Sequence, residues 1–501
     1  MKVEFLPPVA GPVNGSHHAQ AAAANAIVAD SAQGVLRDAL SGEVAVDRLL
    51  LRAAAGAGKS FLLKRLVADA ITHPGVSRVV VTAFTNKQTH PIARDLGLEL
   101  GADRVALLVA ANRLGEVPDD TRDAATVVSD VASIPPTAIV VIAPIHKLGS
   151  HYASQFNSTL GAGANGNAPF DVLLVDEAWQ VANHLFDKVS RLAPLWVGVG
   201  DVGQLPPLEI GANPWRSDTG YNPYRAWPTA FESGDRKTSV HELPSVWRPP
   251  AGSLALWRAF YPDWSELNSV VAPEDRWVEF ESMSPVATTI WKQVAAGIPT
   301  LLEVDGLPDP DAADVDLPLT KFIESLVDEL MGADVRFYSR MLDRHGSPTT
   351  EIKIATPLET HNHPLVAILA TRNQARDDLE EMTNRLIKRH SLASDVVVPS
   401  TVDSWQGQTN AFTVAIHPLS GAASLDEFNS AFGRLAVMCT RATHGTLLVS
   451  RSGLDTLLAE APARPGTPLG EPGFRTLPRQ THERILEAFA RGRLTVTVVN
   501  E

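Results

Sequence analysis

The chain has 501 residues, enough for roughly two to four domains, and its hydrophobic share of 45% allows well-packed cores. A net charge of −14 argues against a protein that coats nucleic acid by overall charge, so such binding would need a local groove. The single cysteine, Cys439, excludes a framework of intrachain disulfides and a cysteine-based zinc cluster, and it fits a reducing compartment. Apolar runs stay below the roughly 18 residues of a membrane span, and residues 1–15 lack a signal-peptide core, so we expect a cytoplasmic protein.

The first half of the chain alternates between helical and strand patterns. A lead containing Pro and Gly covers residues 1–16, and an Ala-rich helical stretch covers residues 17–40. Continuous β-branched and aliphatic runs are typical of parallel strands buried on both faces. Their alternation with helices predicts a doubly wound α/β domain. The expected strands cover residues 78–86, 138–145, 172–175 and 195–199, and the expected helices cover residues 60–72 and 91–100.

A second α/β pattern begins after about residue 250. Its expected strands cover residues 299–304, 366–370, 396–399, 413–416 and 446–450, and its helices cover residues 317–331 and 373–390. The tail is rich in Pro and Gly at residues 461–473, then looks helical at 480–491 and strand-like at 494–499. We therefore divide the chain into a lead (1–16), a first domain (17–245), a second domain (246–452) and a C-terminal appendage (453–501) that is a candidate for recruiting a protein partner.

The segment LLLRAAAGAGKSFLLK, at residues 49–64, has the order strand, glycine-rich turn, helix. Glycines let the backbone approach a phosphate closely, and the following helix N-terminus favours an anion. Lys59 can then reach the β- and γ-phosphates, and the Ser60 hydroxyl can bind Mg²⁺. The pattern G-x-x-x-x-G-K-[ST] has Ala53 in its first position here. The expected nucleotide-binding residues are Ala55, Gly56, Ala57, Gly58, Lys59, Ser60 and Phe61.

Two further strands end in acidic or polar residues. FDVLLVDEAWQ, at residues 170–180, is an apolar strand that ends in two carboxylates. Asp176 is placed to hold Mg²⁺ together with Ser60, and Glu177 to accept a proton from an attacking water. VGVGDVGQLPPL, at residues 197–208, ends a strand with Asp201 followed by Gln204, which we expect to sense the γ-phosphate.

Taken in order, these segments resemble the motifs of superfamily 1 helicases, and the resemblance covers most of the chain. It implies two tandem RecA-like, doubly wound parallel-sheet domains with an ATP-binding cleft between them. The D-E-A-x-Q form of the second motif and the Trp-Arg segment resemble the Upf-like and RecD-like branch. The matching segments are AAAGAGKS, TAFTNK (82–87), DEAWQ, GDVGQLPP, LPSVWRPP (243–250), ILATRNQARDDL (368–379), STVDSWQGQTN (400–410) and FGRLAVMCTRATHGTLLV (432–449).

The resemblance also selects residues that face the nucleotide. Arg248 and Arg441 are the arginines placed to stabilise the transferring phosphoryl group, a task that needs positive charge opposite the loop. Gln406 and Gly407 are implied to couple the nucleotide to strand contacts. The glutamine that reads adenine is either Gln33, which has the more usual distance from Lys59, or Gln20. Thr409 stands where the family usually carries Glu.

Strand binding is expected to use backbone contacts and stacking, not recognition of base edges. Residues 213–227 interleave aromatic and basic residues, which suits a single strand, but we favour a Pro-rich surface loop whose aromatics pack on the domain. The candidate strand contacts are Thr82, Asn86, Lys87, His146, Lys147, Thr401 and Trp405.

The sequence therefore predicts an ATP- and Mg²⁺-dependent helicase or translocase on single-stranded nucleic acid. We favour DNA as the strand, and the resemblance implies 5′→3′ movement. Three alternatives remain open. One is a helicase-fold ATPase that acts as a nucleotide-gated switch or assembly factor without unwinding. Another is a terminase-like packaging ATPase, which would lack the GDVGQLPP and RLAVMCTRAT segments. The third is a protein without ATP hydrolysis, which would require the assignments of Glu177 and of the two arginines to be wrong.

Overall fold

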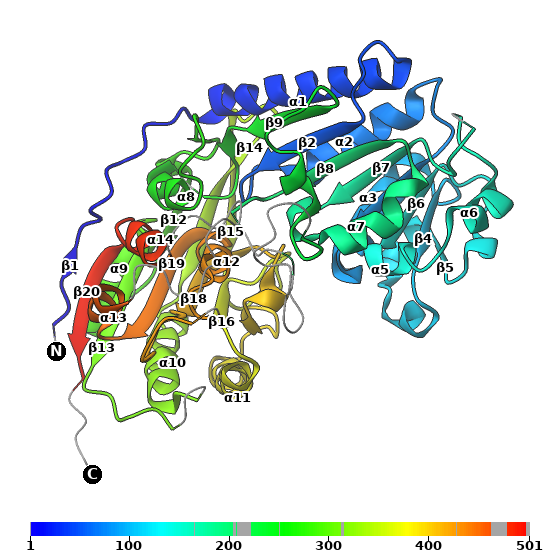
Figure 1. The fold of residues 1–501 in the computed structure, drawn as a ribbon. Helices are drawn as coiled ribbons and strands as arrows, with labels where there is room; N and C mark the ends of the chain where they lie inside the picture. The colour runs from blue at the N-terminus through cyan, green and yellow to red at the C-terminus, as the bar shows by residue number, and fades with distance from the viewer. Residues whose placement is uncertain are drawn as a thin grey trace.

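The computed structural model describes residues 2–164, 166–203, 207, 222–249, 251–311, 315–426, 428–461 and 478–496. Two α/β lobes lie side by side in it (Figure 1). No helix in the described ranges is long and apolar enough to span a membrane.

The first lobe is built on a sheet of eight strands in which all neighbours run parallel. The β-branched runs of the sequence form its central strands, because both faces of such a sheet are covered by helices. Across the sheet the strands are β5 (Thr126–Val128), β4 (Val105–Leu108), β6 (Val140–Pro144), β3 (Val79–Ala83), β7 (Val172–Asp176), β8 (Leu195–Gly200), β2 (Arg48–Ala53) and β9 (Thr238–Leu243).

Helices bury both faces of this sheet. The face that carries Leu49, Val79 and Val81 packs against α2 (Lys59–Thr72) and α3 (Asn86–Leu100). The opposite face, with Leu50 and Val80, packs against α5 (Ile145–Leu148), α6 (Ala153–Leu160) and α7 (Asn183–Val189). The long helix α1 (His18–Ser41) lies along α2 and β9, and α4 (Asp119–Ala124) packs on α3.

The second lobe contains a sheet of seven strands, all parallel except the edge strand β1. One face is covered by α9 (Pro285–Ala295), α10 (Leu317–Met331) and α11 (Asn373–His390). The other packs against α12 (Phe432–Cys439), α13 (Leu454–Glu460) and α14 (Pro478–Leu486). The strand order is β1 (Phe5–Leu6), β20 (Ala490–Thr495), β13 (Thr300–Asp305), β19 (Ala442–Arg451), β18 (Asn410–Ile416), β16 (Val366–Ala370) and β17 (Val397–Thr401).

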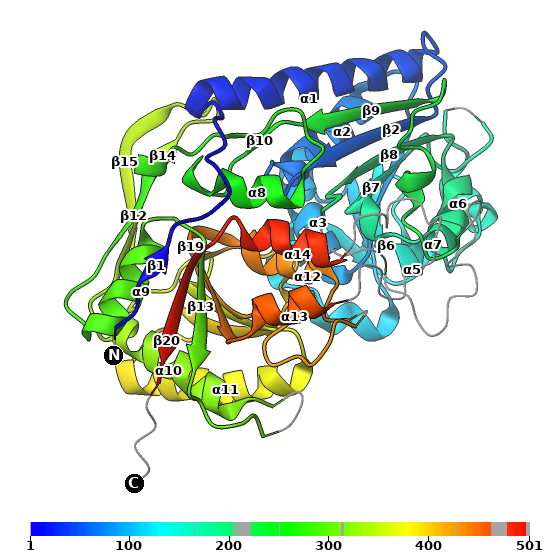
Figure 2. The ribbon, with the colours of Figure 1, turned by 60° about the vertical axis from the view of Figure 1, so that its left-hand side comes forward.

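Both ends of the chain take part in this second sheet. The expected helix over residues 480–491 ends at Leu486, and a strand occupies 490–495, earlier than the expected 494–499. This strand, β20, pairs parallel with β13, and β1 pairs antiparallel with β20. Residues 490–495 are thus an integral strand of the lobe and not a free tail, and Figure 2 shows residues 5–17 running beside them before reaching α1.

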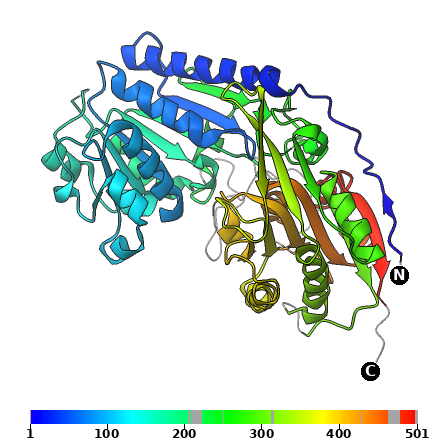
Figure 3. The same cartoon turned by 180° about the vertical axis from the view of Figure 1, so that it is seen from behind.

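The connection between the lobes carries short pairings and a helix. After β10 (Ser245–Val246), which pairs with β11 (Asn268–Ser269), the chain forms α8 (Leu254–Phe260). The side chains of α8 join a core cluster that includes residues of both sheets. A small antiparallel sheet of β12 (Arg276–Glu279), β14 (Arg336–Leu342) and β15 (Pro348–Ala355) then projects from the second lobe toward α1 (Figure 3). The sequence patterns did not predict this sheet.

Candidate nucleotide-binding and hydrolysis site

The glycine-rich turn joins β2 to α2, as the sequence predicts. Gly56 and Gly58 have φ angles of 79° and 92°, a region that favours glycine. Helix α2 begins at Lys59, so its free N–H groups and the positive end of its dipole face the turn. A side chain at position 56 would lie 2.5 Å from Cβ of Arg248, so only glycine lets that arginine pass so close to the loop.

A cleft of about 1890 Å³ opens between the two lobes at this loop. It brings together residues that are up to about 400 positions apart in the sequence. From the first lobe it is lined by Gly56, Gly58, Lys59, Ser60, Phe61, Asp176, Glu177 and Asp201, and from the connection and the second lobe by Trp247, Arg248, Tyr261, Gln406, Gly407, Thr409 and Arg441. The cleft therefore contains most of the residues that the sequence selects for the nucleotide.

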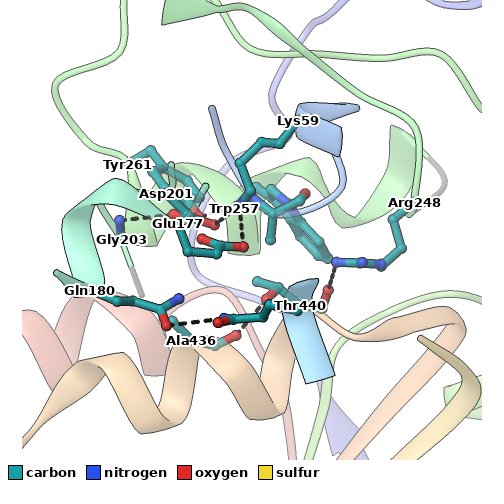
Figure 4. A network of polar contacts seen from close by, with 12 residues as sticks. Lys59, Glu177, Gln180, Asp201, Gly203, Arg248, Trp257, Tyr261, Ala436 and Thr440 are labelled. Atoms are coloured by element: carbon teal, nitrogen blue, oxygen red, sulfur yellow. Dashed lines mark hydrogen bonds and ion pairs between the residues drawn. The ribbon is translucent and has the colours of Figure 1, made fainter. Parts of the chain in front are cut away.

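The lysine of the loop is held by two carboxylates. Lys59 Nζ lies 3.4 Å from Glu177 Oε1 and 3.5 Å from Asp201 Oδ2 (Figure 4). Glu177 reaches this place with a left-handed backbone, at a φ of 48°, directly after strand β7. Figure 4 shows Glu177, Asp201 and Lys59 pointing toward one another from separate elements. An incoming phosphate is expected to displace these carboxylates as partners of the lysine.

Burial changes the acid strength of the neighbouring carboxyl. Removal from water, together with the charge of Glu177, raises the pKa of Asp176 to about 7, and Lys59 opposes the shift. Asp176 Oδ1 and Glu177 Oε2 are buried and have no hydrogen-bond partner among the described residues. Buried polar atoms are normally paired, and Mg²⁺ prefers oxygen ligands. With Ser60 in the same cleft, these residues fit a magnesium ion that accompanies the nucleotide.

Two arginines line the cleft, Arg248 from the connection that passes the glycine-rich turn and Arg441 from the second lobe. Arg248 donates from Nη1 to the carbonyl of Thr440 at 2.8 Å and from Nη2 to Thr409 Oγ1 at 3.1 Å. Burial, then the charge of Arg441, lowers the pKa of Arg248 to about 9. Arg441 is 3% exposed, and its Nε and Nη2 have no partner among the described residues. Burial lowers the pKa of Arg441, while Glu177 and Asp201 across the cleft act in the opposite direction.

Comparison with known protein families gives a match within the first half of the chain. Residues 31–216, which include the glycine-rich turn, match the family model of an AAA domain. This match covers less than half of the chain. No curated protein matches it.

The solved structures similar to this chain include viral helicases. The PRRSV helicase is 14% identical, with a TM-score of 0.37, over 84% of this chain and 56% of that one. The helicase of an arterivirus, nonstructural protein 10, is 13% identical, with a TM-score of 0.40, over 82% of this chain and 61% of that one. The same arterivirus protein in complex with DNA gives 14% identity and a TM-score of 0.39, over 82% and 62%. This chain thus spans about three fifths of the length of these helicases.

The adenine-reading glutamine is not where the sequence places it. Gln33 is buried between α1 and α2, where its amide donates to Asp69 and accepts from Arg65. It does not line the cleft in the described part of the chain, because its position on α1 faces the adjacent helix. Gln20, the alternative, is exposed and also lies outside the cleft lining. The expected γ-phosphate sensor Gln204 falls outside the described residues.

Three of the expected strand contacts are turned into the protein. Thr82 is fully buried and donates to the carbonyl of Ala143, since it lies inside strand β3. Trp405 is 7% exposed and donates from Nε1 to Asn410 Oδ1, so its ring packs in the core and cannot stack on a base. Thr401 is also buried, at 6% exposure, and bonds Ser404.

The other expected contacts remain accessible. Asn86 and Lys87 line the cleft at the start of α3, and His146 is exposed. Lys147 is half-buried and donates to the carbonyl of Ser129. Of the aromatic segment 213–227, Tyr224 lines the cleft, whereas Trp227 is buried and stacks on Phe186 at 4.0 Å. Trp215, Arg216 and Tyr221 fall outside the described residues.

Sequence reasoning missed two groups at the site. Phe84, which follows β3, lies against His146 with ring centroids 5.5 Å apart and lines the cleft. Its position inside the segment TAFTNK, which was already expected to contact the strand, could have identified Phe84 as a candidate. Tyr261 and Trp257, from the connection between the lobes, bond the glycine-rich turn itself. No motif identifies them, because their role depends on how the connection folds back onto the first lobe.

Proposed function

We propose that this protein hydrolyses ATP with Mg²⁺ and uses closure and opening of its cleft to move along a single-stranded nucleic acid, unwinding or remodelling it. The observation that carries the proposal is the meeting of Lys59 and Glu177, from the first lobe, with Arg441, from the second, at one cleft. A site that needs both lobes links phosphate chemistry to their relative position.

The residues of the chain have separable roles in this reaction. Lys59 and the backbone N–H groups of the turn bind the phosphates, and Glu177 accepts the proton of the attacking water. Arg248 and Arg441 place positive charge opposite the loop, where negative charge develops in the transition state. Ser60 and Asp176 would hold Mg²⁺, which when bound neutralises charge on the phosphates.

The nucleic-acid strand is proposed to cross the first lobe at the ends of β3 and β6. Four side chains lie at these strand ends: Phe84, Asn86, Lys87 and His146. The two rings could stack on bases, and the lysine could bind a phosphate. The 5′→3′ direction rests on the resemblance of the DEAWQ and VWRPP segments to the Upf-like and RecD-like branch, and DNA is proposed as the strand. We also propose that the protein works in the cytoplasm.

The deciding experiment measures ATP turnover with no nucleic acid, with single-stranded DNA, with single-stranded RNA and with blunt duplex DNA. We expect single-stranded DNA to stimulate turnover most and Lys59→Ala to abolish it, because the loop loses its phosphate-binding charge. Partial duplexes with a 5′ or a 3′ tail then test direction. If Lys59→Ala abolishes turnover but no strand changes the wild-type rate, the motor is excluded.

One observation favours a second candidate function, a nucleotide-gated switch without unwinding. Three of the seven expected strand contacts are buried and form hydrogen bonds inside the protein: Thr82, Thr401 and Trp405. A switch would hydrolyse ATP through the same cleft without needing those contacts. Turnover that ignores every nucleic acid would support it.

A further inference from the structure

Tyr261 lies at the centre of a hydrogen-bond cluster beneath the glycine-rich turn. Its hydroxyl donates to Asp201 Oδ1 at 2.7 Å and accepts from the backbone N–H of Ala55 at 3.2 Å. Asp201 holds Lys59 with its other oxygen, Oδ2, at 3.5 Å. One phenol group therefore connects the backbone of the turn to the carboxylate that faces the lysine (Figure 4).

The surroundings of Tyr261 fix its ring. Only 2% of the residue is exposed, and Trp264 packs on it with ring centroids 4.9 Å apart. Gly203 lies against the other side, since a Cβ there would come within 2.5 Å of Tyr261 Cε1. Burial and the adjacent Asp201 raise the pKa of Tyr261 well above its usual value, so the phenol stays protonated and remains a donor.

A second group from the same helix secures the turn. Trp257 Nε1 donates to the carbonyl of Ala55 at 3.0 Å. The side chains of Tyr261 and Trp257 thus bond both the N–H and the carbonyl of Ala55. The backbone N–H of Trp247, earlier in the same connection, donates to the carbonyl of Gly56 at 2.7 Å. The connection between the lobes therefore forms hydrogen bonds to two consecutive residues of the turn, Ala55 and Gly56.

We propose that Tyr261 is a positioning residue for hydrolysis, which orients Asp201 and the Ala55 amide relative to Lys59. The inference rests on the proposed ATPase function and adds a residue to it. Asp201 Oδ1 also accepts from the N–H of Gly203, so without the tyrosine hydroxyl the carboxylate keeps one of the two bonds that turn Oδ2 toward the lysine and loses the shorter one. The remaining N–H groups of the turn and Lys59 still bind phosphates, so the geometry around the reacting phosphate changes more than nucleotide affinity.

The test is Tyr261→Phe, which removes one oxygen and keeps the ring. We expect kcat for ATP to fall about tenfold while KM changes less than about threefold, the pattern of an interaction that matters in the transition state. Affinity for ADP with aluminium fluoride, a mimic of that state, should fall by a similar factor, and affinity for ADP should stay within about twofold. Trp257→Phe removes the bond to the other side of Ala55 and should also lower kcat.

Thr383→Val is the matched control. It removes a buried hydroxyl that donates to the carbonyl of Leu379 inside α11, far from the cleft, and should leave kcat unchanged. Wild-type kcat in a folded Tyr261→Phe protein, or an equal loss of kcat in Thr383→Val, overturns the inference and leaves the ATPase proposal intact. If Tyr261→Phe does not fold, an unchanged kcat in Trp257→Phe overturns it. A wild-type protein that hydrolyses no ATP overturns both.

Discussion

Glu177 lies beside Lys59 with an unfavourable backbone conformation. A residue other than glycine at a φ of 48° costs on the order of 1 kcal/mol, and the cost persists only where surrounding contacts enforce it. Here the left-handed turn directly follows strand β7 and directs the carboxylate to within 3.4 Å of the lysine. An extended residue would continue the strand and carry the carboxylate away from the cleft. The strain therefore coincides with the position proposed for the general base.

His417, at the end of β18, predicts a dependence of stability on pH. Burial, with His482 and Arg491 facing it, lowers the pKa of His417 to about 3, against 6.5 for an exposed histidine. Because the unfolded chain takes up the proton first, the stability that neutral His417 contributes is complete above pH 6.5 and is lost as the pH falls toward 3. At about 1.4 kcal/mol per pH unit, the loss at pH 4.5 is roughly 2–3 kcal/mol.

His417→Asn removes this titration and keeps an acceptor for the N–H of Leu419, which now bonds Nδ1. Urea unfolding at pH 7.5 and 4.5 should show a smaller decrease in stability for His417→Asn than for the wild type. His17→Asn, at an exposed position, serves as control and should follow the wild type. Identical pH dependence in His417→Asn and the wild type would show that the burial of His417 has no such consequence.

Among the elements, the β14–β15 hairpin joins parts that are distant in the sequence. Its turn at Gly346, with a φ of 78°, touches the start of α1: an added Cβ would lie 2.8 Å from Ala22 Cβ and 2.9 Å from the His18 carbonyl. Leu342 packs on the same small cluster of Ala21, Ala22 and Val270. The hairpin of the second lobe therefore braces the long helix of the first.

Gly346→Ala tests that brace. The substitution combines a left-handed backbone with a steric clash, so we expect the free energy of unfolding to fall by roughly 2–4 kcal/mol. Gly453→Ala is the matched comparison, because Gly453 has a φ of 110° but no atom within 4 Å of the added Cβ, and it should cost about 1 kcal/mol. Thermal unfolding measures both; equal losses would show that the hairpin does not press on α1.

The elements also show what the sequence can predict. The helices at residues 317–331 and 373–390 were predicted with their observed bounds, and the buried parallel strands within a few residues, because continuous apolar runs and helical periodicity are local signals. The hairpin was missed because β15 is exposed on nearly all its length, so no alternation marks it. Gln33 was predicted at the nucleotide and Trp405 at the strand, but both side chains point elsewhere. Gln33 bonds a residue of the facing helix and Trp405 bonds a neighbour in the core, and the motif alone does not show these contacts.

At the scale of the molecule, three connections among the described residues hold the lobes together. The N-terminal segment pairs with β20 in the second lobe and continues into α1 of the first. The α8 connection joins both sheets in one core cluster, and the hairpin contacts α1. Apolar burial across the connection stabilises the arrangement, so cleft motion is expected to be a limited adjustment about α8 and not a separation of the lobes.

We expect Arg441 to lower the stability of the nucleotide-free protein while it promotes ATP hydrolysis at this cleft. Arg441 is 3% exposed, and two nitrogens of its guanidinium are buried and lack partners among the described residues. A buried charge without full pairing is costly. Arg441→Met keeps an unbranched apolar stem and removes the charge, so we expect the nucleotide-free protein to gain about 1–3 kcal/mol in unfolding free energy. The same variant loses the cation opposite the loop, and ATP turnover should fall at least about 100-fold. Urea unfolding and steady-state ATP hydrolysis measure the two effects, with Arg385→Met, an exposed arginine on α11 that pairs with Glu324, expected to change neither by much. A destabilised Arg441→Met protein would show that the arginine holds the lobes together before nucleotide binds, whereas a gain in stability with loss of turnover places its value in the reaction alone.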